Sequence, residues 1–282
     1  MPEGDGATLL AFTADWHTNS IVGLNPPSFC RELESRHVPG AIGRMLWRRW
    51  REFWKIVAQK AHDFDATVYS FAVGDLGDKN KHSAVQLISK GDIDIVDAMI
   101  EVAQPMIETS NHVFILRGTE AHTGGNGMLE ELLARDLDNA VRQSDKVASW
   151  WVVNAEIGGV RILVTHHPPT TAYRPWTMDA AAARAASIVA GKFLDDGDVR
   201  NMPDVAVWAH AHTRGSQAKG MGGVWGIFLP PWQLATSFSH RLGGVIGRPR
   251  VGGLWMVVQD GQILEWDWVR WAPRRDAVWK AA

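Results

Sequence analysis

The chain has 282 residues, of which 46% are hydrophobic and 21% charged, as in soluble globular proteins built from one large α/β domain or two small ones. No apolar stretch approaches the roughly 20 residues that span a bilayer, and the acidic start lacks the basic segment of a secretory signal. The net charge of −2 argues against a long-duplex nucleic-acid binder, and the single Cys30 excludes an internal disulfide and a cysteine-based zinc cluster. We therefore expect a cytoplasmic protein without a membrane partner; its oligomeric state stays open.

The first half of the chain alternates strand and helix patterns. A strand at Thr8–Ala14 is followed by a Pro- and Gly-containing loop at Thr18–Gly40. Apolar residues that recur every three or four positions predict a helix at Arg44–Phe64. After a strand at Ala66–Val73, the same periodicity predicts a helix at Asp92–Gln104, which Pro105 ends or kinks.

From the middle of the chain, strand and hairpin patterns become more frequent. Glycine-containing turns at Gly158-Gly159 and Asp260-Gly261 predict two hairpins. In the last strand, Leu264, Trp266 and Trp268 alternate with acidic residues, which predicts one buried face. The remaining expected elements are strands at Val113–Leu116, Trp150–Ile157, Val160–Thr165, Val205–Trp208, Trp255–Gln259 and Gln262–Trp271, and helices at Met128–Val141 and Met178–Phe193.

This order of elements predicts two sheets packed face to face, with helices outside. We find no repeat, no low-complexity tract and no convincing linker, so a single domain over residues 1–282 is expected. The tryptophan-rich strands at 253–271 belong to the same sandwich in this interpretation. The many tryptophans are interpreted as an aromatic core with an edge hairpin. Two basic clusters, at 48–51 and 270–275, are interpreted as solvated faces or as rims beside a phosphate.

Five of the predicted strands end in residues that bind metals. Because ligands collect outside the carboxyl ends of strands in sheets with helical crossovers, these residues are expected to form one site. A mixed set of nitrogen and oxygen ligands suits Mn, Fe, Zn or Co better than Ca or Mg. The residues, in chain order, are Asp15 and His17; Asp75 and Asp78; Glu120 and His122; His166 and His167; and His210 and His212.

Two such ions can activate a water and hold both the attacking and the leaving oxygen of an in-line displacement. The predicted reaction is therefore hydrolysis of a phosphate ester, by attack of a hydroxide bound to the metals. Asp75 is expected to bridge the two ions, because its two oxygens can serve different metals. Asp78 is expected to be a supporting partner or a helix cap. The sequence leaves open whether His166 or His167 is the ligand.

The ordered motifs resemble those of the calcineurin-like metallophosphoesterases. The likeness covers residues 15–212 through Asp-x-His, Gly-Asp-x-x-Asp, a Gly turn after a strand, His-His-Pro and x-His-x-His. Gly23-Leu24-Asn25-Pro26-Pro27 and Gly-Thr-Glu look more like a branch common in phage and prophage sequences. The resemblance implies a four-layer α/β/β/α sandwich. It places one ion among Asp15, His17, Asp75 and His212, and a second among Asp75, His166 and His210.

The third motif departs from the family pattern. Thr119 and Glu120 stand where the family has an asparagine ligand and a catalytic histidine. Because a threonine hydroxyl is a poor neutral ligand for a divalent ion, Glu120 is the predicted replacement ligand. His122 is predicted to supply the catalytic proton. In the last motif Ala209 replaces a glycine, which is tolerable if its φ stays negative.

The favoured function is a dinuclear-metal phosphoesterase, with Mn as the favoured ion. A phosphodiester is preferred to a monoester because the usual acid is altered and the motifs contain no phosphate-binding arginine cluster. Nucleotides and nucleic acids are candidate substrates. One alternative is a DNA or RNA nuclease of the same superfamily. The other is a metal-binding scaffold with weakened catalysis, which only the altered third motif favours.

Overall fold

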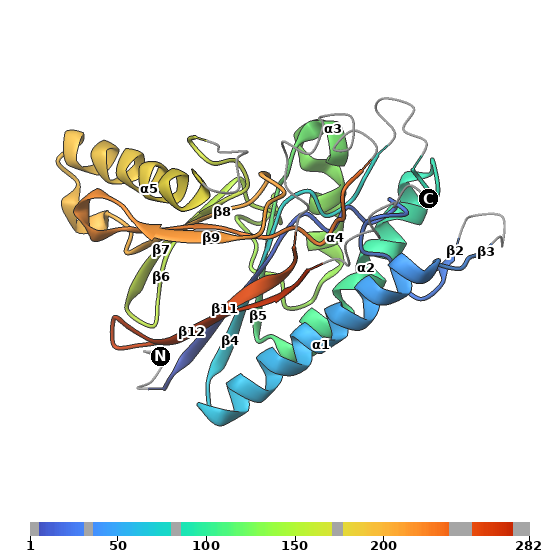
Figure 1. The fold of residues 1–282 in the computed structure, drawn as a ribbon, viewed down its shortest axis with the longest axis horizontal. Coiled ribbons are helices and arrows are strands. Elements are labelled where there is room, and N and C mark those ends of the chain that lie inside the picture. The colour runs from blue at the N-terminus through green and yellow to red at the C-terminus, as the bar shows by residue number, and fades with distance from the viewer. Residues whose placement is uncertain (1–5, 31–35, 80–85, 171–176, 237–249, 273–282) are drawn as a thin grey trace, which may run out of the picture.

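Two five-stranded mixed sheets face each other, and helices cover the outer face of each sheet (Figure 1). The computed structural model describes residues 6–30, 36–79, 86–170, 177–236 and 250–272. The layers therefore follow the order helix, sheet, sheet, helix, which confirms the predicted fold class. None of the described helices is both long and apolar enough to cross a membrane.

The first sheet has the strand order β12-β11-β1-β4-β5. Strands β1, β4 and β5 run parallel, so their carboxyl ends share one edge, while β11 and β12 run antiparallel to their neighbours. Full burial of β1 on both faces matches its uninterrupted apolar sequence. The strands are β1 (Thr8–Thr13), β4 (Thr67–Val73), β5 (His112–Leu116), β11 (Val251–Gln259) and β12 (Gln262–Trp271).

The second sheet has the strand order β6-β7-β8-β10-β9, with parallel β7, β8 and β10. Both predicted hairpins form, at Gly158-Gly159 and at Asp260-Gly261. A small separate sheet pairs β2 (Phe29–Cys30) with β3 (Arg36–His37). The strands of the second sheet are β6 (Val152–Ile157), β7 (Val160–Thr165), β8 (Val205–Trp208), β9 (Ser216–Lys219) and β10 (Trp225–Phe228).

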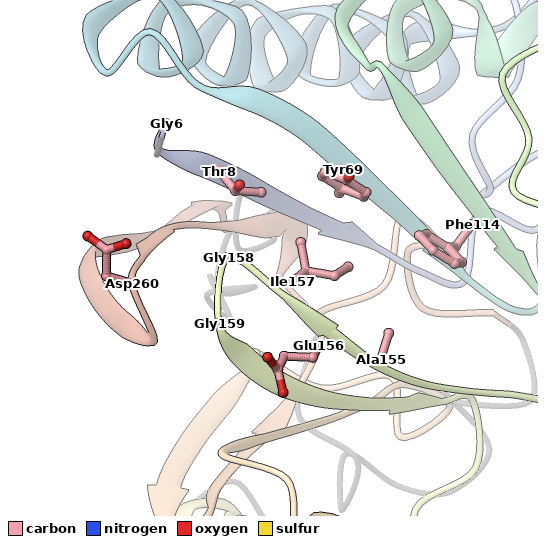
Figure 2. Close-up of a pocket in the computed structure, with 10 residues that line it drawn as sticks. All are labelled: Gly6, Thr8, Tyr69, Phe114, Ala155, Glu156, Ile157, Gly158, Gly159 and Asp260. Carbon is pink, nitrogen blue, oxygen red and sulfur yellow. The ribbon is translucent and has the colours of Figure 1, made fainter. Parts of the chain in front are cut away.

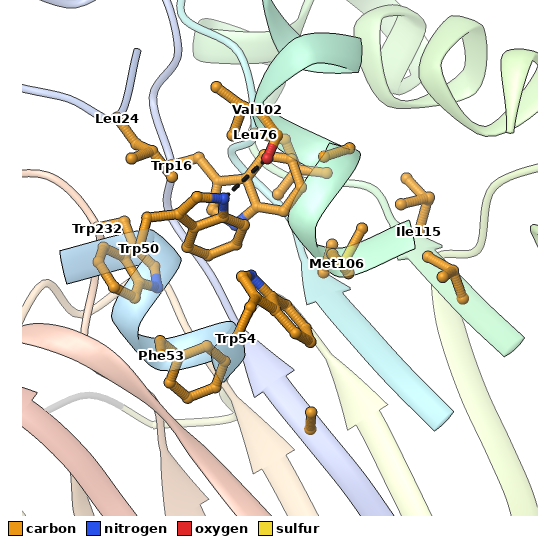
Figure 3. Packing of buried hydrophobic residues seen from close by; sticks show 14 of the residues in the cluster. Trp16, Leu24, Trp50, Phe53, Trp54, Leu76, Val102, Met106, Ile115 and Trp232 are labelled. Atoms are coloured by element: carbon orange, nitrogen blue, oxygen red, sulfur yellow. Dashed lines mark hydrogen bonds between the residues drawn. The ribbon is translucent and has the colours of Figure 1, made fainter. Parts of the chain in front are cut away.

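Helices on the first sheet pack through an aromatic core (Figure 3). Trp50 is its centre: the ring contacts Trp16, Trp54 and Trp232, and its Nε1–H donates to the carbonyl of Val102 at 2.8 Å. The alanine-rich α5 covers the second sheet. The helices are α1 (Ala41–Asp63), α2 (Asp92–Thr109), α3 (Glu120–Thr123), α4 (Met128–Asp136) and α5 (Met178–Asp195), with 3₁₀ turns at Gly125–Gly127, Val199–Asn201 and Met221–Gly223.

Three expectations about individual elements were wrong in detail. Helix α2 does not end before Pro105 but continues to Thr109, because buried Val102 and Met106 hold it against the sheet. Helix α4 ends at Asp136, since the backbone around Val141 bonds to β5 instead. Leu264 is exposed, because β12 bulges there and the register skips it.

Candidate metal centre

The carboxyl ends of β1 and β4 are joined by backbone hydrogen bonds beyond the strands themselves. The N–H of Asp15 donates to Gly74 at 3.0 Å, and the N–H of His17 donates to Asp75 at 3.0 Å. The second sheet reaches the same place, because the N–H of His210 donates to Asp15 Oδ2 at 3.3 Å. Segments nearly 200 residues apart therefore meet at one edge of the sandwich, as the sequence predicted.

Backbone strain is concentrated at this edge. Nine non-glycine residues of the described chain have positive φ, and five of them are predicted metal ligands. Such conformations are uncommon for residues with a side chain, and they persist where the surrounding structure requires them. The five are Asp15, His17, Asp75, His210 and His212, with φ between 45° and 67°. Ala209 is not among the positive-φ residues, so replacing the family's glycine there is sterically tolerable.

Asp15, His17 and His212 form the first group of ligand atoms, which we call site 1. The Nε2 atoms of His17 and His212 lie 3.1 Å apart, and His212 Nε2 lies 3.3 Å from Asp15 Oδ1. Asp15 also groups with Asp75 and His166, so the two carboxylates lie between the two halves of the centre.

Asp75, His166, His167 and His210 form the second half, which we call site 2. Asp75 Oδ2 lies 3.2 Å from His166 Nε2, and the three histidines form one group of potential ligands. His166 is buried and its Nδ1–H donates to the carbonyl of Val73 at 2.8 Å, which leaves Nε2 to face the site. His167 is exposed, and sequence reasoning treated it only as a substitute for His166. The structure brings both side chains to site 2.

Thr119 lies in the middle of site 2. Its Oγ1 is 3.2 Å from Asp75 Oδ2, 3.3 Å from His210 Nδ1 and 3.4 Å from His167 Nε2. Its N–H donates to Asp75 Oδ1 at 2.5 Å. This approach requires glycine at position 118, because a Cβ there would overlap the backbone and carboxylate of Asp75.

Glu120 is the predicted ligand that the structure does not bring to the centre. It begins α3 with an exposed side chain, and its Oε1 lies 3.5 Å from the N–H of Asn126. No group of potential ligand atoms in the described chain includes it. The start of a short helix turns Glu120 outward, so its geometry does not support a ligand role.

His122, the predicted proton donor, is held beside site 1 by Asp78. Its Nδ1 lies 3.0 Å from Asp78 Oδ1, and its ring meets that of His17 edge-on at 4.6 Å. The side chain of His122 is 37% exposed, whereas that of Asp78 is 5% exposed. Asp78 is therefore a buried partner that orients a histidine open to solvent.

Neighbouring charges and burial shift the pKa values of several side chains in the centre. Burial acts to raise the pKa of Asp75, but the charge and hydrogen bond of His166, together with the charges of His17 and His122, outweigh burial and hold this pKa well below its usual value. Burial acts to lower the pKa of His166, but Asp75, Asp15 and the carbonyl of Val73 together outweigh burial and raise this pKa to about 9. Burial and then the charge of His166 lower the pKa of His210 to about 4. Burial acts to raise the pKa of Asp78, but the hydrogen bonds of its carboxylate to His122 and His17 lower this pKa to about 2.

The donor atoms fit divalent ions. Two ligand atoms about 2.1 Å from one ion lie about 3.0–3.4 Å apart in octahedral or tetrahedral geometry, close to the spacing within site 1. Asp15 Oδ1 is buried and has no hydrogen-bond partner within the described residues. A buried polar atom without a partner is energetically unfavourable, and an ion bound at site 1 would be such a partner. These clusters can therefore hold metal ions.

The loop after β1 is anchored beside the centre. The buried Asn19 donates from Nδ2 to the carbonyls of Asp78 and Ser89 at 2.8 and 2.9 Å. Its Oδ1 accepts the N–H of Ser89 at 2.7 Å, and its own N–H donates to Asn25. These hydrogen bonds therefore hold the described first part of the predicted loop in place beside the centre. The sequence pattern did not reveal this role of Asn19.

A separate cavity of about 490 Å³ lies at the opposite end of the sandwich (Figure 2). It is lined by the start of β1 and by both hairpin turns, together with the side chains of Tyr69, Phe114, Glu156 and Asp260. It contains none of the predicted ligands. Among the described residues, the groups of potential metal ligands lie at the carboxyl edge and not around this cavity.

Comparisons with known proteins found only a distant structural similarity. No protein-family profile matches the sequence, and no curated protein is similar to it. Among solved structures, the sulfate thiohydrolase SoxB from Thermus thermophilus, in complex with glycerol, aligns with 96% of this chain at 10% identity and a TM-score of 0.42. The chain spans 57% of that protein's length. A likeness this distant carries no functional argument, so function must be argued from the site itself.

Proposed function

We propose that this protein is a metal-dependent phosphoesterase that binds two divalent ions and hydrolyses phosphodiesters. The observation that carries the proposal is the convergence of Asp15, Asp75 and five histidines, His17, His166, His167, His210 and His212, at one edge of two sheets. The mixed nitrogen and oxygen donors favour Mn over Ca or Mg. The resemblance of the ordered motifs to calcineurin-like metallophosphoesterases supports the same reaction class.

In this proposal both sites bind an ion, and the two ions act together. Bound ions would lower the pKa of a water and neutralise charge on the phosphate. One ion would be held by Asp15, His17 and His212 at site 1 and the other by His166 and His210 at site 2, with Asp75 between them and His167 also at site 2. The strained backbone holds these donors before substrate arrives, which reduces the reorganisation that the reaction requires.

His122 is the proposed proton donor to the leaving oxygen. Its ring is partly exposed next to site 1, and the buried Asp78 holds Nδ1 at 3.0 Å, which leaves Nε2 as the atom that gives up the proton. Asp78 positions this histidine and offsets the positive charge that it carries before transfer. The phosphodiester preference rests on the altered third motif, in which Thr119 and Glu120 replace the usual residues.

The test is an assay of purified protein reconstituted with Mn²⁺, with the metal content measured by elemental analysis. Substrates are a bis-aryl phosphate, a cyclic nucleotide, single-stranded DNA and an aryl monoester. We expect two ions per chain and faster turnover of the diesters. Two bound ions without turnover of any substrate would contradict the enzymatic proposal and favour the scaffold alternative.

Asp75→Asn separates an enzyme from a scaffold. Removing the charge that lies between the two sites should lower activity by several orders of magnitude and reduce the bound metal. Asp97→Asn is the matched control, because Asp97 is an exposed carboxylate on α2, away from the centre. Equal activity of both variants would show that Asp75 has no part in the reaction.

A further inference from the structure

Three arginines gather beside the metal centre. Arg270 lies near the end of β12, Arg250 directly precedes β11, and Arg214 follows the ligand His212 by two residues. The Nη1 of Arg270 donates to the carbonyls of Arg214 and Gly215, at 3.1 and 3.3 Å. Its guanidinium also lies 4.8 Å from the ring centre of Trp268. Arg270 therefore joins the first sheet to the loop that carries His212.

Strand register places this cluster at the catalytic edge. Phe12 pairs with Leu254, so the same antiparallel register, continued, sets Ala14 beside Gly252, and Gly252 pairs with Arg270. Two strand spacings, about 10 Å, separate Arg270 from the chain next to Asp15. From the other sheet, the Cα of Arg214 lies no more than about 7 Å from that of His212. A phosphate adjacent to a reacting one can reach this cluster.

The cluster carries excess positive charge. Arg214 pairs with the exposed Asp179 at 3.5 Å. Arg250 is exposed and has no hydrogen bond or ion pair with any described residue. Burial and then the charges of Arg250 and Arg214 lower the pKa of Arg270, against the weaker opposing effects of Asp267 and Asp179. Like charges held together in this way are unfavourable alone and favourable around an anion.

We infer that Arg214, Arg250 and Arg270 bind a second phosphate of the substrate, and that the substrate is a short single strand of nucleic acid. This inference rests on the proposed function, since the first phosphate would occupy the metal centre. Guanidinium groups present a planar fork that matches phosphate oxygens. A cluster of three arginines on a chain of net charge −2 suits a few phosphates of a flexible strand rather than a long duplex.

Binding to metal-free protein tests the phosphate site without requiring catalysis. The probe is a fluorescently labelled six-nucleotide oligothymidylate in EDTA, measured by anisotropy over a series of salt concentrations. Arg270→Gln and the exposed Arg250→Gln should each weaken binding about tenfold. Each should also lower the slope of log affinity against log salt by about 0.7, the value for one phosphate contact with a single strand. The matched control is Arg200→Gln, an exposed arginine before the amino end of β8.

Hydrolysis with Mn²⁺ then separates the two proposals. For Arg250→Gln, kcat/KM should fall about tenfold more on a 5′-phosphorylated dinucleotide than on a bis-aryl phosphate, with two ions still bound. Equal losses on both substrates, or equal oligonucleotide binding by Arg250→Gln and Arg200→Gln, would overturn the second-phosphate site. Arginine-dependent oligonucleotide binding without turnover of any substrate would support this site and contradict the proposed reaction.

Discussion

Glu130 offers a quantitative test of the electrostatics behind the metal centre. It lies in α4 with no exposed surface, and its Oε1 accepts the N–H of Leu76 at 3.2 Å, next to Asp75. Its Oε2 has no hydrogen-bond partner among the described residues. Burial, and then the charge of Asp75, raise the pKa of Glu130 to about 7. We predict that Glu130→Gln stabilises the metal-free protein at high pH.

The sign and size follow from linkage between protonation and folding. The pKa of Glu130 rises from 4.5 in the unfolded chain to about 7 in the folded protein. Its contribution to stability is complete below pH 4.5 and is lost as pH rises through 7. At about 1.4 kcal/mol per pKa unit, the full loss is roughly 3 kcal/mol. The glutamine of the variant would keep an acceptor for the N–H of Leu76 and cannot ionise, so the variant's advantage should grow by about 2–3 kcal/mol between pH 5 and pH 9.

The assay is urea unfolding in EDTA at both pH values, monitored by tryptophan fluorescence. The neighbouring Glu131 is the control, because its shift is opposite. Burial works to raise its pKa, but hydrogen bonds from Ser149 and Ala148 prevail and hold it at about 2. Its stabilisation is present above pH 4.5 and is lost as pH falls through 2, so Glu131→Gln should destabilise equally at pH 5 and pH 9. A Glu130→Gln effect that is constant between these pH values would refute the reasoning.

Three further predictions concern the centre and the loop beside it. Gly118→Ala places a Cβ against the backbone and carboxylate of Asp75, so elemental analysis should find fewer than two ions per chain, whereas an unchanged metal content would contradict the close packing. His122→Gln should lower kcat about 100-fold on esters with poor leaving groups while two ions remain bound; an unchanged kcat would remove His122 from the reaction. Asn19→Ala loses three hydrogen bonds to Asp78 and Ser89, one of them buried and two partly buried, and should destabilise the protein by about 3 kcal/mol in urea unfolding. A loss of less than about 1 kcal/mol in the free energy of unfolding would show that Asn19 does not hold the loop after β1 in place.

Much of the fold was predictable because its signals are local. Apolar runs bounded by turn residues identified β1, β4, β7 and β8, and the spacing of buried residues identified α1 to within three residues. Gly-Gly and Asp-Gly turns identified both hairpins. Local periodicity was insufficient where another segment competes for the backbone, as at the end of α4, or where a bulge shifts the register, as at Leu264.

The sequence by itself also predicted most of the residues that the structure brings together. Asp15, His17 and Asp75 follow strands of the first sheet, whereas His166, His210 and His212 follow strands of the second. Within each sheet the carboxyl ends of the parallel strands share one edge. Only the tertiary structure decided which third-motif side chain faces site 2. Glu120 and Thr119 are neighbours in the chain, but the start of α3 turns one towards solvent and the other towards Asp75.

Only the tertiary structure also decided the places of His167 at site 2, of Asn19 in the loop after β1 and of the arginines beside His212. Each of these depends on contacts between residues far apart in the chain, which no spacing in the sequence encodes. Strand order and register place such groups together, and these are set by packing of the two sheets rather than by local preference. Chain pattern thus decided which residues can bind a metal, and packing decided which of them meet.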